Sequence, residues 1–583
     1  MFVNSSATWL EQQLTKLSQR QWLLAWLVFA GVIIFTGIGL RSPWPADEPR
    51  FAEIAREMVD TGQWLIPMRG GEYYPDKPPV FMWTIALFYW VTGNLKVAFL
   101  LPSALCGLIT LAAVYDLGCR LWSKRIAVNS VFLLLLAPQF LLQAKTAQID
   151  GMVACWITLS CYGLLRHFLD GPSWGWYFFA WAFMGLGIIT KGVGFLPILM
   201  LPLLFFVYRQ PNANLSPAPR WPLALGPLIM LAVIALWLIP MLLFVNKVHT
   251  PEIIAYRDNI LFRQTGERYL NSWGHIKPWY YFIVNVIPVL WFPLPFLLLA
   301  SLGSLRKKVT TRPDVWVILL WVLLVVIFFS LSPGKRGVYV LPALPMFALA
   351  VAAITDNHRL AGWLKPLVTS VHWAIGFLLI SIGIIAWNEL PLLANKIAQY
   401  TQDISDLHTA GTFFVGIGIL WIAAWIVFFK QSVFIRFFAG LMAIWLLYST
   451  WGYILLEPLR TPRNVLVATE TQLPADASLG IIDFSEQYIL FSRLDVTHFG
   501  FGASFQDDER NAWLWMTEGN NRYVLVEADK ALECFDVKGA TDVGVAHRRR
   551  WLLIGTEQRV DHCPPPSSRR QFITRNPGHW LEE

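Results

Sequence analysis

Ionisable side chains are concentrated in one segment of the chain, from Arg41 to Pro79, which holds seven acids and five bases. Asp47 and Glu48 stand near its beginning, and Asp76 and Lys77 stand near its end. Carboxylates can orient or deprotonate a reacting group, and a lysine can hold an anion. Because charged groups beside a bilayer are costly unless they act on something, we expect an active site here, at a membrane surface.

The first acids stand at the start of an expected helix. After Asp47, Glu48 and Arg50, apolar residues recur at helical spacing from Phe51 to Met58, which predicts a helix lying along the membrane. Acids also favour the first turn of a helix, so capping is the alternative role for both. We favour a chemical role for Asp47 and leave the two roles of Glu48 open.

A stiff corner closes the segment. Tyr74, Asp76 and Lys77 precede two successive prolines, Pro78 and Pro79, which fix the backbone and remove hydrogen-bond donors. Such a corner can hold the Lys77 ammonium in one place, where it suits a phosphate as a point charge. The alternative is a loop that only turns the chain back into the bilayer.

Three later turns carry similar groups. Asp150 begins an apolar run, Lys191 interrupts two such runs beside Gly192, and Tyr339 follows a turn with two bases. A helix cap for Asp150 and a lysine that reaches to the interface for Lys191 are the alternatives. Basic groups at headgroup depth predict an anionic partner, most simply a phosphate. The predicted basic ring comprises Arg50, Lys77, Lys191, Lys335 and Arg336.

The composition places these groups in a membrane protein. The 583 residues are 56% hydrophobic and only 14% charged, whereas soluble domains are about 25% charged. Runs of about 17–25 apolar residues predict roughly thirteen spans. The segment 80–92 is too short to cross comfortably and is expected to be an interfacial or re-entrant helix. The spans are expected near 21–40, 96–117, 126–144, 151–169, 174–190, 193–208, 222–246, 280–302, 314–331, 337–355, 366–388, 411–429 and 433–455.

Charge distribution predicts the orientation. With the N-terminus inside, the inner loops carry Arg120, Lys124, Arg125, Arg166, Arg209, Arg220, Arg306, Lys307, Lys308, Arg312, Arg359, Lys365, Lys430 and Arg436. This agrees with the preference of positive loops for the cytoplasm, and it puts every polar motif on the outer side. The same preference explains the net charge of +8 better than a nucleic-acid partner does, so none is expected.

The tail, 457–583, differs in character from the apolar region 1–456. Strand-like runs at Leu479–Phe484, Tyr488–Leu494, Tyr523–Glu527 and Trp551–Gly555, with a helical run at Asp508–Glu518, predict a small α/β domain. On the outer side its two cysteines, Cys534 and Cys563, are expected to form a disulfide, with two free thiols as the alternative. The chain shows no nucleotide-binding loop and no reliable set of metal ligands, so no cofactor is expected; whether a divalent ion takes part is left open.

Taken together, these motifs resemble a known family. The acidic pair Asp47-Glu48, the corner Tyr74–Pro79, Asp150, Thr190-Lys191-Gly192 and the stretch Lys335–Pro342 are similar, in order over about 20–350, to membrane glycosyltransferases that use polyprenyl-phosphate sugars. The bacterial lipid A aminoarabinose transferases, which are related to the protein O-mannosyltransferases, look nearest. Two positions depart from their pattern, since Phe51 and Asp76 stand where Tyr and Glu are usual.

The resemblance implies a GT-C-like transmembrane bundle with membrane-parallel helices in the first outer loop and a periplasmic C-terminal α/β domain. It implies inverting transfer of 4-amino-4-deoxy-L-arabinose, or a related sugar, from undecaprenyl phosphate to lipid A or another envelope acceptor, at the periplasmic face of a bacterial inner membrane. Asp47, Lys77 and Asp150 are the expected catalytic residues. The expected substrate-binding residues are Glu48, Arg50, Tyr74, Asp76, Lys191, Lys335, Arg336 and Tyr339.

Two alternatives to this function are retained. One is transfer to a hydroxyl acceptor, as protein O-mannosyltransferases perform it, in which case Asp47 must act as general base. The other, from a different class, is a transporter or flippase for the lipid carrier. A flippase needs polar residues along a path through the bilayer, whereas here they gather at one face, which favours the transferase.

Overall fold

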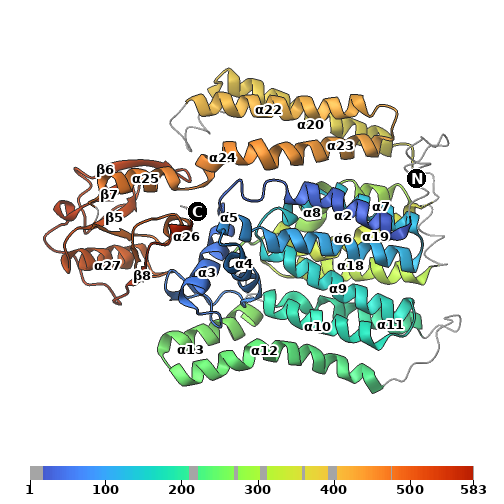
Figure 1. Cartoon of the computed structure of the whole chain (residues 1–583), viewed down its shortest axis with the longest axis horizontal. Helices are drawn as coiled ribbons and strands as arrows, with labels where there is room; N and C mark the ends of the chain where they lie inside the picture. Colours follow the sequence, from blue (N-terminus) through green and yellow to red (C-terminus); the bar gives the residue numbers. More distant parts are fainter. Residues whose placement is uncertain are drawn as a thin grey trace.

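The computed structural model describes residues 18–208, 221–267, 274–302, 312–356, 361–391, 404–474 and 476–581. Long helices run side by side, and a small mixed domain lies at one end of them (Figure 1). The chain is therefore an α-helical polytopic membrane protein with a small C-terminal α/β domain, as the sequence predicted. Six of the bases predicted for the inner loops, Arg209, Arg220, Arg306, Lys307, Lys308 and Arg359, lie outside the described residues.

Within the described ranges, eight helical stretches are long and apolar enough to cross a membrane, and one bent pair brings the number to nine. All thirteen predicted spans overlap helical segments, but several of these are shorter, so the number thirteen stays a prediction. The eight stretches are Leu95–Leu121, Ile149–Leu169, Pro222–Val248, Pro313–Leu331, Gly337–Thr355, Leu364–Trp387, Leu407–Val427 and Val433–Arg460.

The bundle has a centre and two flanks (Figure 1). The central helices are α2 (Gln19–Phe35), α5 (Leu95–Ala98), α6 (Leu101–Leu121), α7 (Lys124–Leu136), α8 (Pro138–Ala144), α9 (Ile149–Leu169), α18 (Pro313–Leu331), η5 (Gly337–Ala343) and α19 (Leu344–Thr355). One flank comprises α10 (Trp174–Lys191), η1 (Val193–Met200), α11 (Leu201–Tyr208), η2 (Trp221–Ala224), α12 (Leu225–Val248), α13 (Pro251–Asp258) and η3 (Asn259–Glu267). The other comprises α20 (Leu364–Trp387), α22 (Ile404–Val427), α23 (Val433–Leu447), η6 (Tyr448–Gly452) and α24 (Tyr453–Arg460). Three short segments, η4 (Phe282–Val286), α15 (Ile287–Leu290) and α16 (Leu294–Leu299), precede α18.

The segment 41–79, which the sequence predicts to be the first outer loop and which is called the first loop below, folds with α4 into a compact platform. Helix α3 (Glu48–Thr61) has Pro49 in its first turn, where a missing N–H is harmless, and ends at Gly62, whose φ of 72° suits glycine. A hairpin of β1 (Met68–Arg69) and β2 (Glu72–Tyr73) follows, and then α4 (Val80–Thr92). The Phe51 ring of α3 packs edge-on against the Phe81 ring of α4, with 5.1 Å between centroids. The helices predicted at Phe51–Met58 and 80–92 are thus confirmed as helices.

One acid of α3, Glu57, is buried and forms no salt bridge within the described part of the chain. Glu57 lies beside Glu53, and one of its oxygens accepts the backbone N–H of Gly71 at 2.8 Å. Burial, with a contribution from Glu53, raises the pKa of Glu57 to about 7. A folded-state pKa above the unfolded value means that the folded protein loses stability as pH rises from about 4.5 towards 7.

We therefore expect Glu57→Gln to raise the thermal midpoint of the detergent-solubilised protein at pH 8 and to change it little at pH 4. Glutamine keeps an acceptor for Gly71 and removes the charge, so the gain is at most about 3 kcal/mol, at about 1.4 kcal/mol per pKa unit. Asp60→Asn, in the same helix but partly exposed, is the control. Equal gains at both pH values would contradict a titrating Glu57.

The tail forms a six-stranded mixed sheet in the order β6-β7-β5-β3-β4-β8, in which β3 pairs in parallel with both β4 and β5. Its elements are α25 (Arg463–Gln472), β3 (Ser478–Ile481), α26 (Glu486–Leu490), β4 (Val496–His498), α27 (Phe505–Thr517), β5 (Arg522–Glu527), β6 (Thr541–Ala546), β7 (Arg549–Ile554), η7 (Thr556–Gln558), β8 (Phe572–Thr574) and η8 (His579–Leu581).

Most of the predicted tail elements are present. Strands β3, β5 and β7 and helix α27 overlap the predicted segments. The strand predicted at Tyr488–Leu494 is wrong, because helix α26 covers its first part and a turn covers the rest. Helix α24 runs through 456–457, so the change in composition falls inside a helix and the domain boundary placed there stays a prediction.

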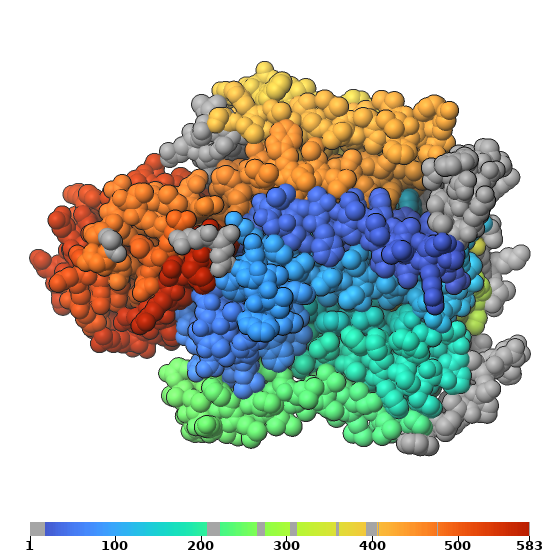
Figure 2. Space-filling model, viewed as in Figure 1, coloured from blue at the N-terminus to red at the C-terminus, as the bar shows by residue number. Residues whose placement is uncertain are grey.

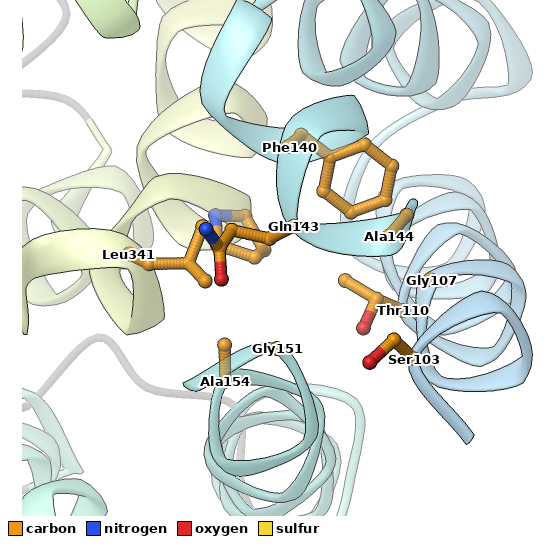
Figure 3. Close-up of a pocket in the computed structure, with 10 residues that line it drawn as sticks. Ser103, Gly107, Thr110, Phe140, Gln143, Ala144, Gly151, Ala154 and Leu341 are labelled. Carbon is orange, nitrogen blue, oxygen red and sulfur yellow. The ribbon is translucent and has the colours of Figure 1, made fainter. Parts of the chain in front are cut away.

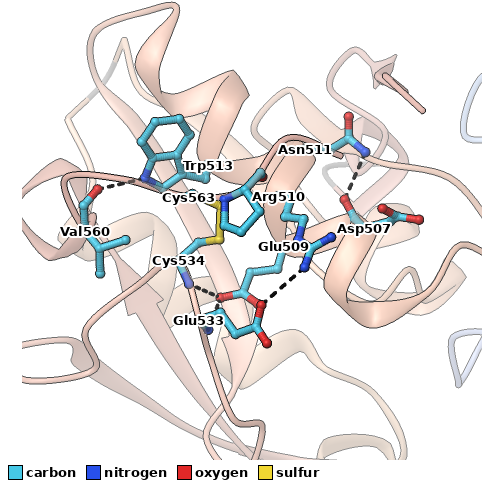
Figure 4. The surroundings of a disulfide bond; sticks show 10 residues. Asp507, Glu509, Arg510, Asn511, Trp513, Glu533, Cys534, Val560 and Cys563 are labelled. Atoms are coloured by element: carbon cyan, nitrogen blue, oxygen red, sulfur yellow. Dashed lines mark hydrogen bonds and ion pairs between the residues drawn. A yellow bond between two sulfur atoms is a disulfide. The ribbon is translucent and has the colours of Figure 1, made fainter. Parts of the chain in front are cut away.

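The predicted disulfide between Cys534 and Cys563 is present, with 5.1 Å between the Cα atoms (Figure 4). The carboxylate of Glu509, from α27, accepts the backbone N–H groups of Glu533 and Cys534 at 2.7 Å each. The indole N–H of Trp513 donates to the carbonyl of Val560 at 3.0 Å. The disulfide therefore joins two irregular segments, and hydrogen bonds from α27 hold each of these segments as well.

We expect the Cys534→Ser/Cys563→Ser double variant to lower the stability of the tail by about 3–4 kcal/mol, because the bond closes a 29-residue separation and restricts the unfolded chain. Limited proteolysis of the tail at rising temperature measures the loss. Cys119→Ser, which leaves the bond intact, is the control. Two alkylatable tail cysteines in unreduced wild-type protein would contradict the bond.

The tail packs directly on the first loop, at one end of the bundle (Figure 2). The imidazole Nε2 of His498 donates to the carbonyl of Gly70 at 2.7 Å, and the carboxylate of Glu72 accepts the N–H of Phe501 at 2.7 Å. A Cβ at Gly70 would lie 2.8 Å from the His498 ring, and φ there is 64°, so this close approach requires glycine. Burial lowers the pKa of His498 to about 3, which keeps the ring neutral and suited to a single donated bond.

Candidate functional site

Asp47 lies where α3 begins, but it does not cap the helix. It occupies the N-cap position and its side chain makes no capping hydrogen bond. One carboxylate oxygen instead accepts a hydrogen bond from the Arg336 guanidinium at 2.9 Å, and the other lies 3.7 Å from that of Arg50. The Asp47 side chain is 16% exposed, so a ligand can reach it. The capping alternative for Asp47 is therefore not what the structure has.

Arg50 joins the loop to the tail. Its Nε donates to the carboxylate of Glu486 at 2.7 Å, and Arg69 donates to the same oxygen at 2.9 Å. The ring of Tyr74 is buried and lies 5.2 Å from the Arg69 guanidinium carbon. Tyr74 therefore packs against Arg69, beside the Glu486 carboxylate that Arg69 and Arg50 share.

Asp150 and Lys191 form the second half of the site. Asp150 is in the first turn of α9, and Lys191 is the last residue of α10, so each charge also complements a helix dipole. The two side chains form a salt bridge with only 11% and 15% exposure. The Lys191 ammonium also lies 4.9 Å from the centre of the Tyr339 ring. Asp150 and Lys191, 41 residues apart in the chain, thus lie beside Tyr339, which follows Lys191 by more than a hundred residues.

The two halves are adjacent. Arg336 directly precedes η5 and Tyr339 lies within it, so the same short segment contributes to both halves. Burial lowers the pKa of Arg336, but the charges of Asp47 and then Asp150 outweigh it and raise the pKa overall. The structure therefore brings together six predicted residues, Asp47, Arg50, Asp150, Lys191, Arg336 and Tyr339.

Glu48, unlike its neighbour, is locked inside the protein. It forms a buried double hydrogen bond with Arg41 and accepts the backbone N–H groups of Trp44 and Ala147 at 2.9 Å each. Arg41 is itself buried and donates to the carbonyl of Lys145 at 3.3 Å. These bonds tie the start of the loop to the turn that precedes α9, which favours the structural role for Glu48.

The other three predicted residues, Asp76, Lys77 and Lys335, form different contacts. The Lys77 ammonium donates to the carbonyl of Asp76 at 2.8 Å, and the Asp76 carboxylate accepts from Gln264 at 3.2 Å. The ammonium of Lys335 donates to the carbonyls of Ser332 and of Lys277, the latter at 3.0 Å. Burial lowers the pKa of Lys335. The predicted basic ring thus has two kinds of member. Arg50, Lys191 and Arg336 face the carboxylates of Asp47 or Asp150, whereas Lys77 and Lys335 donate to backbone carbonyls.

A small cavity adjoins the site on the bilayer side (Figure 3). It has a volume of about 20 Å³, which suits one water molecule, and it is lined from α6, α8, α9, η5 and α19. Gly151 and Leu341, which line it, follow Asp150 and Tyr339 closely in the chain. Gln143 also lines it and donates to the side chain of Gln148 at 2.8 Å. The cavity is too small for a sugar or a phosphate.

Two contributors were missed by sequence reasoning. Glu486 pairs with Arg50 and Arg69, and Glu457 accepts the N–H of Ser42 at 3.1 Å and the indole N–H of Trp44 at 2.8 Å. Both acids lie in the tail, more than four hundred residues from their partners. A lone acid in a charged tail carries no local signal of such a contact. Arg69 had a weak signal, since it directly precedes the Gly70-Gly71 turn.

Across the described part of the chain, no group of three or more His, Cys, Asp or Glu side chains is arranged to hold a metal ion. The charges of the site are instead distributed as acid–base pairs between side chains. The site can therefore bind an anion by exchange, in which an incoming phosphate competes with a carboxylate for a lysine or arginine.

Comparisons with known proteins agree with this fold. Residues 76–239 match the family described as dolichyl-phosphate-mannose-protein mannosyltransferase. The structure of ArnT from Cupriavidus metallidurans bound to undecaprenyl phosphate superimposes with a TM-score of 0.68 at 19% identity, and covers 93% of this chain and 99% of that one. The chain thus has the fold of a membrane glycosyltransferase.

Two curated relatives show which kind of membrane glycosyltransferase the chain resembles. Both are undecaprenyl phosphate-alpha-4-amino-4-deoxy-L-arabinose arabinosyl transferases. That of Yersinia enterocolitica is 28% identical over 337 residues, 57% of this chain and 58% of its own length. That of Serratia proteamaculans is 25% identical over 417 residues, 71% of this chain and 72% of its own length. The match thus spans less than two thirds of the Yersinia relative. The resemblance to bacterial aminoarabinose transferases that the motifs predicted is confirmed.

Proposed function

We propose that the protein transfers 4-amino-4-deoxy-L-arabinose from undecaprenyl phosphate to lipid A, at the periplasmic face of a bacterial inner membrane. The observation that carries the proposal is the meeting of Asp47, Arg336, Asp150 and Lys191 at the end of the bundle where the first loop and the tail lie. The names of the similar proteins supply the sugar and the carrier, whereas lipid A as the acceptor comes from the family resemblance of the sequence motifs.

In the proposed reaction the acceptor oxygen attacks the anomeric carbon of the sugar, and the bond from that carbon to the phosphate oxygen breaks on the opposite face. The leaving group is undecaprenyl phosphate, which carries away the electron pair as an anion. Lys191 and Lys77 stabilise that charge in a partly dehydrated site. Donor binding would draw Lys191 away from Asp150 and free the carboxylate for the sugar.

Asp47 acts on the acceptor. A lipid A phosphate is already ionised and needs no base, so Asp47 would orient it through Arg336, which is 2.9 Å away. A hydroxyl acceptor would have to give its proton to Asp47 as the bond forms. The match of residues 76–239 to the mannosyltransferase family makes hydroxyl transfer the second candidate.

The orientation proposed rests on charge. Described bases such as Arg120, Lys124, Lys365 and Lys430 lie at or beside ends of α6, α7, α20 and α23, and these helix ends lie on the side away from the tail (Figure 1), as the bases of positive cytoplasmic loops should. The site and the tail are then periplasmic. The partners are the lipid-linked sugar donor, the envelope acceptor and the surrounding membrane lipids.

Mass spectrometry of lipid A from otherwise identical cells with and without the gene tests the proposal. We expect aminoarabinose-modified lipid A only when the gene is present. Unmodified lipid A in both strains, with a sugar appearing on a protein or another hydroxyl acceptor, would favour the second candidate. No transferred sugar anywhere, with altered sidedness of the lipid carrier, would favour a flippase.

A further inference from the structure

Glu486 belongs to the tail domain, yet its carboxylate lies among residues of the first loop. It is the first residue of α26, directly after the turn that follows the central strand β3. Its side chain is only 9% exposed and accepts from Arg50 at 2.7 Å and Arg69 at 2.9 Å. Burial raises the pKa of Glu486, but Arg50 and Arg69 outweigh it and lower the pKa overall. The tail acid is therefore held as an anion by two loop arginines.

Arg50 connects this anion to the acid of the site. Its Nε is taken by Glu486, whereas a terminal nitrogen lies 3.7 Å from Asp47. Asp47 makes its closer contact, 2.9 Å, with Arg336. The order of charges is thus Glu486, Arg50, Asp47, Arg336, with alternating sign. Arg50 therefore lies closer to Glu486, at 2.7 Å, than to Asp47, at 3.7 Å.

We propose that Glu486 is a positioning residue for sugar transfer, through which the tail domain holds Arg50 and so fixes the direction of the Asp47 carboxylate. This inference rests on the proposed function. Without the Glu486 charge, Asp47 is the carboxylate nearest to Arg50 in the loop, and the planar guanidinium can close on it with two parallel hydrogen bonds. That rearrangement draws Asp47 away from Arg336 and out of the geometry for transfer.

The positioning role is separable from docking of the tail. His498 to Gly70 and Glu72 to Phe501 hold the tail on the hairpin without involving Arg50. Glu72→Gln weakens one docking contact and leaves the Glu486–Arg50 pair in place. Glu527 is a matched control inside the tail, since it is equally buried and paired with Arg549, away from the first loop.

The test is the steady-state kinetics of the purified full chain with the undecaprenyl-phosphate-linked sugar. We expect Glu486→Gln to lower kcat on the order of 10- to 100-fold, as misplacement of a reacting group does, with little change in KM for the donor. Glu486→Asp, which keeps the charge, should recover part of kcat. Glu72→Gln and Glu527→Gln should keep near wild-type kcat. In an Arg50→Gln background, Glu486→Gln should cause no further loss.

Three results would overturn the inference: wild-type kcat in Glu486→Gln, an equal loss in Glu72→Gln, or an additive loss in the Arg50→Gln background. If Glu486→Gln does not accumulate, Glu486→Asp decides, because wild-type kcat with the shorter side chain would also overturn it. A wild-type protein that transfers no sugar at all would reject the proposed function instead.

Discussion

Asparagine in place of Asp47 is expected to lower kcat for sugar transfer by at least about 100-fold, the low end of what a positioned acid or base contributes. Insertion into the membrane and binding of the lipid-linked donor should stay close to wild type. The substitution preserves volume and removes the charge that faces Arg336 at 2.9 Å. Turnover by purified protein, with donor affinity measured separately, checks both halves of the expectation.

The structure explains why this variant should still fold. Asp47 is 16% exposed and its two arginine partners each have another acid close by, Glu486 for Arg50 and Asp150 for Arg336. Neither base is left as an uncompensated buried charge, which is the costly outcome. Asp60→Asn, at the other end of α3, is the matched control and should keep wild-type kcat. Near-normal turnover by Asp47→Asn would remove Asp47 from the mechanism.

The adjacent acids Asp47 and Glu48 show how far the sequence could go. The amphipathic pattern that follows them correctly predicted a helix, α3, with both acids at its beginning. The sequence could not show that the two acids have different roles. The difference depends on Arg41, which forms a buried hydrogen-bonded pair with Glu48, and on Arg336, which contacts Asp47 from a loop almost three hundred residues later. Long apolar runs and turn residues fix local structure, whereas pairing across the bundle is a tertiary property.

The tail was the least predictable part. Short apolar runs such as Tyr488–Leu494 fit a buried helix as well as a strand. Here the first part of the run belongs to helix α26. Strands β4 and β8 have three residues each, too few for a periodic signal. The role of Glu486 could not be foreseen for the same reason that applies to Asp47, since its partners lie in the first loop. The disulfide was predictable because only two cysteines were available in the tail.

Alanine in place of Lys191 is expected to weaken binding of the phosphate-linked donor by about 1.5–3 kcal/mol, the usual value of a hydrogen bond to a charged group. That corresponds to about a 10- to 100-fold rise in Kd. Lys191 is placed for this role by its position at the end of α10 and by the Tyr339 ring 4.9 Å away. Lys77→Ala should change Kd in the same direction. Lys430→Ala, in the turn before α23 at the far end of the bundle, is the control and should leave Kd unchanged.

Loss of Lys191 also leaves Asp150 without its salt-bridge partner, and an uncompensated carboxylate would repel the donor phosphate. The Lys191→Ala/Asp150→Asn double variant separates these two effects, because it removes the repulsion without restoring the lysine. We expect its donor affinity to stay well below wild type, and Lys191→Arg to recover most of it. Wild-type affinity in the double variant would mean that Lys191 only neutralises Asp150 and does not bind the phosphate. Titration of purified protein with undecaprenyl phosphate, followed by intrinsic tryptophan fluorescence, measures all of these affinities.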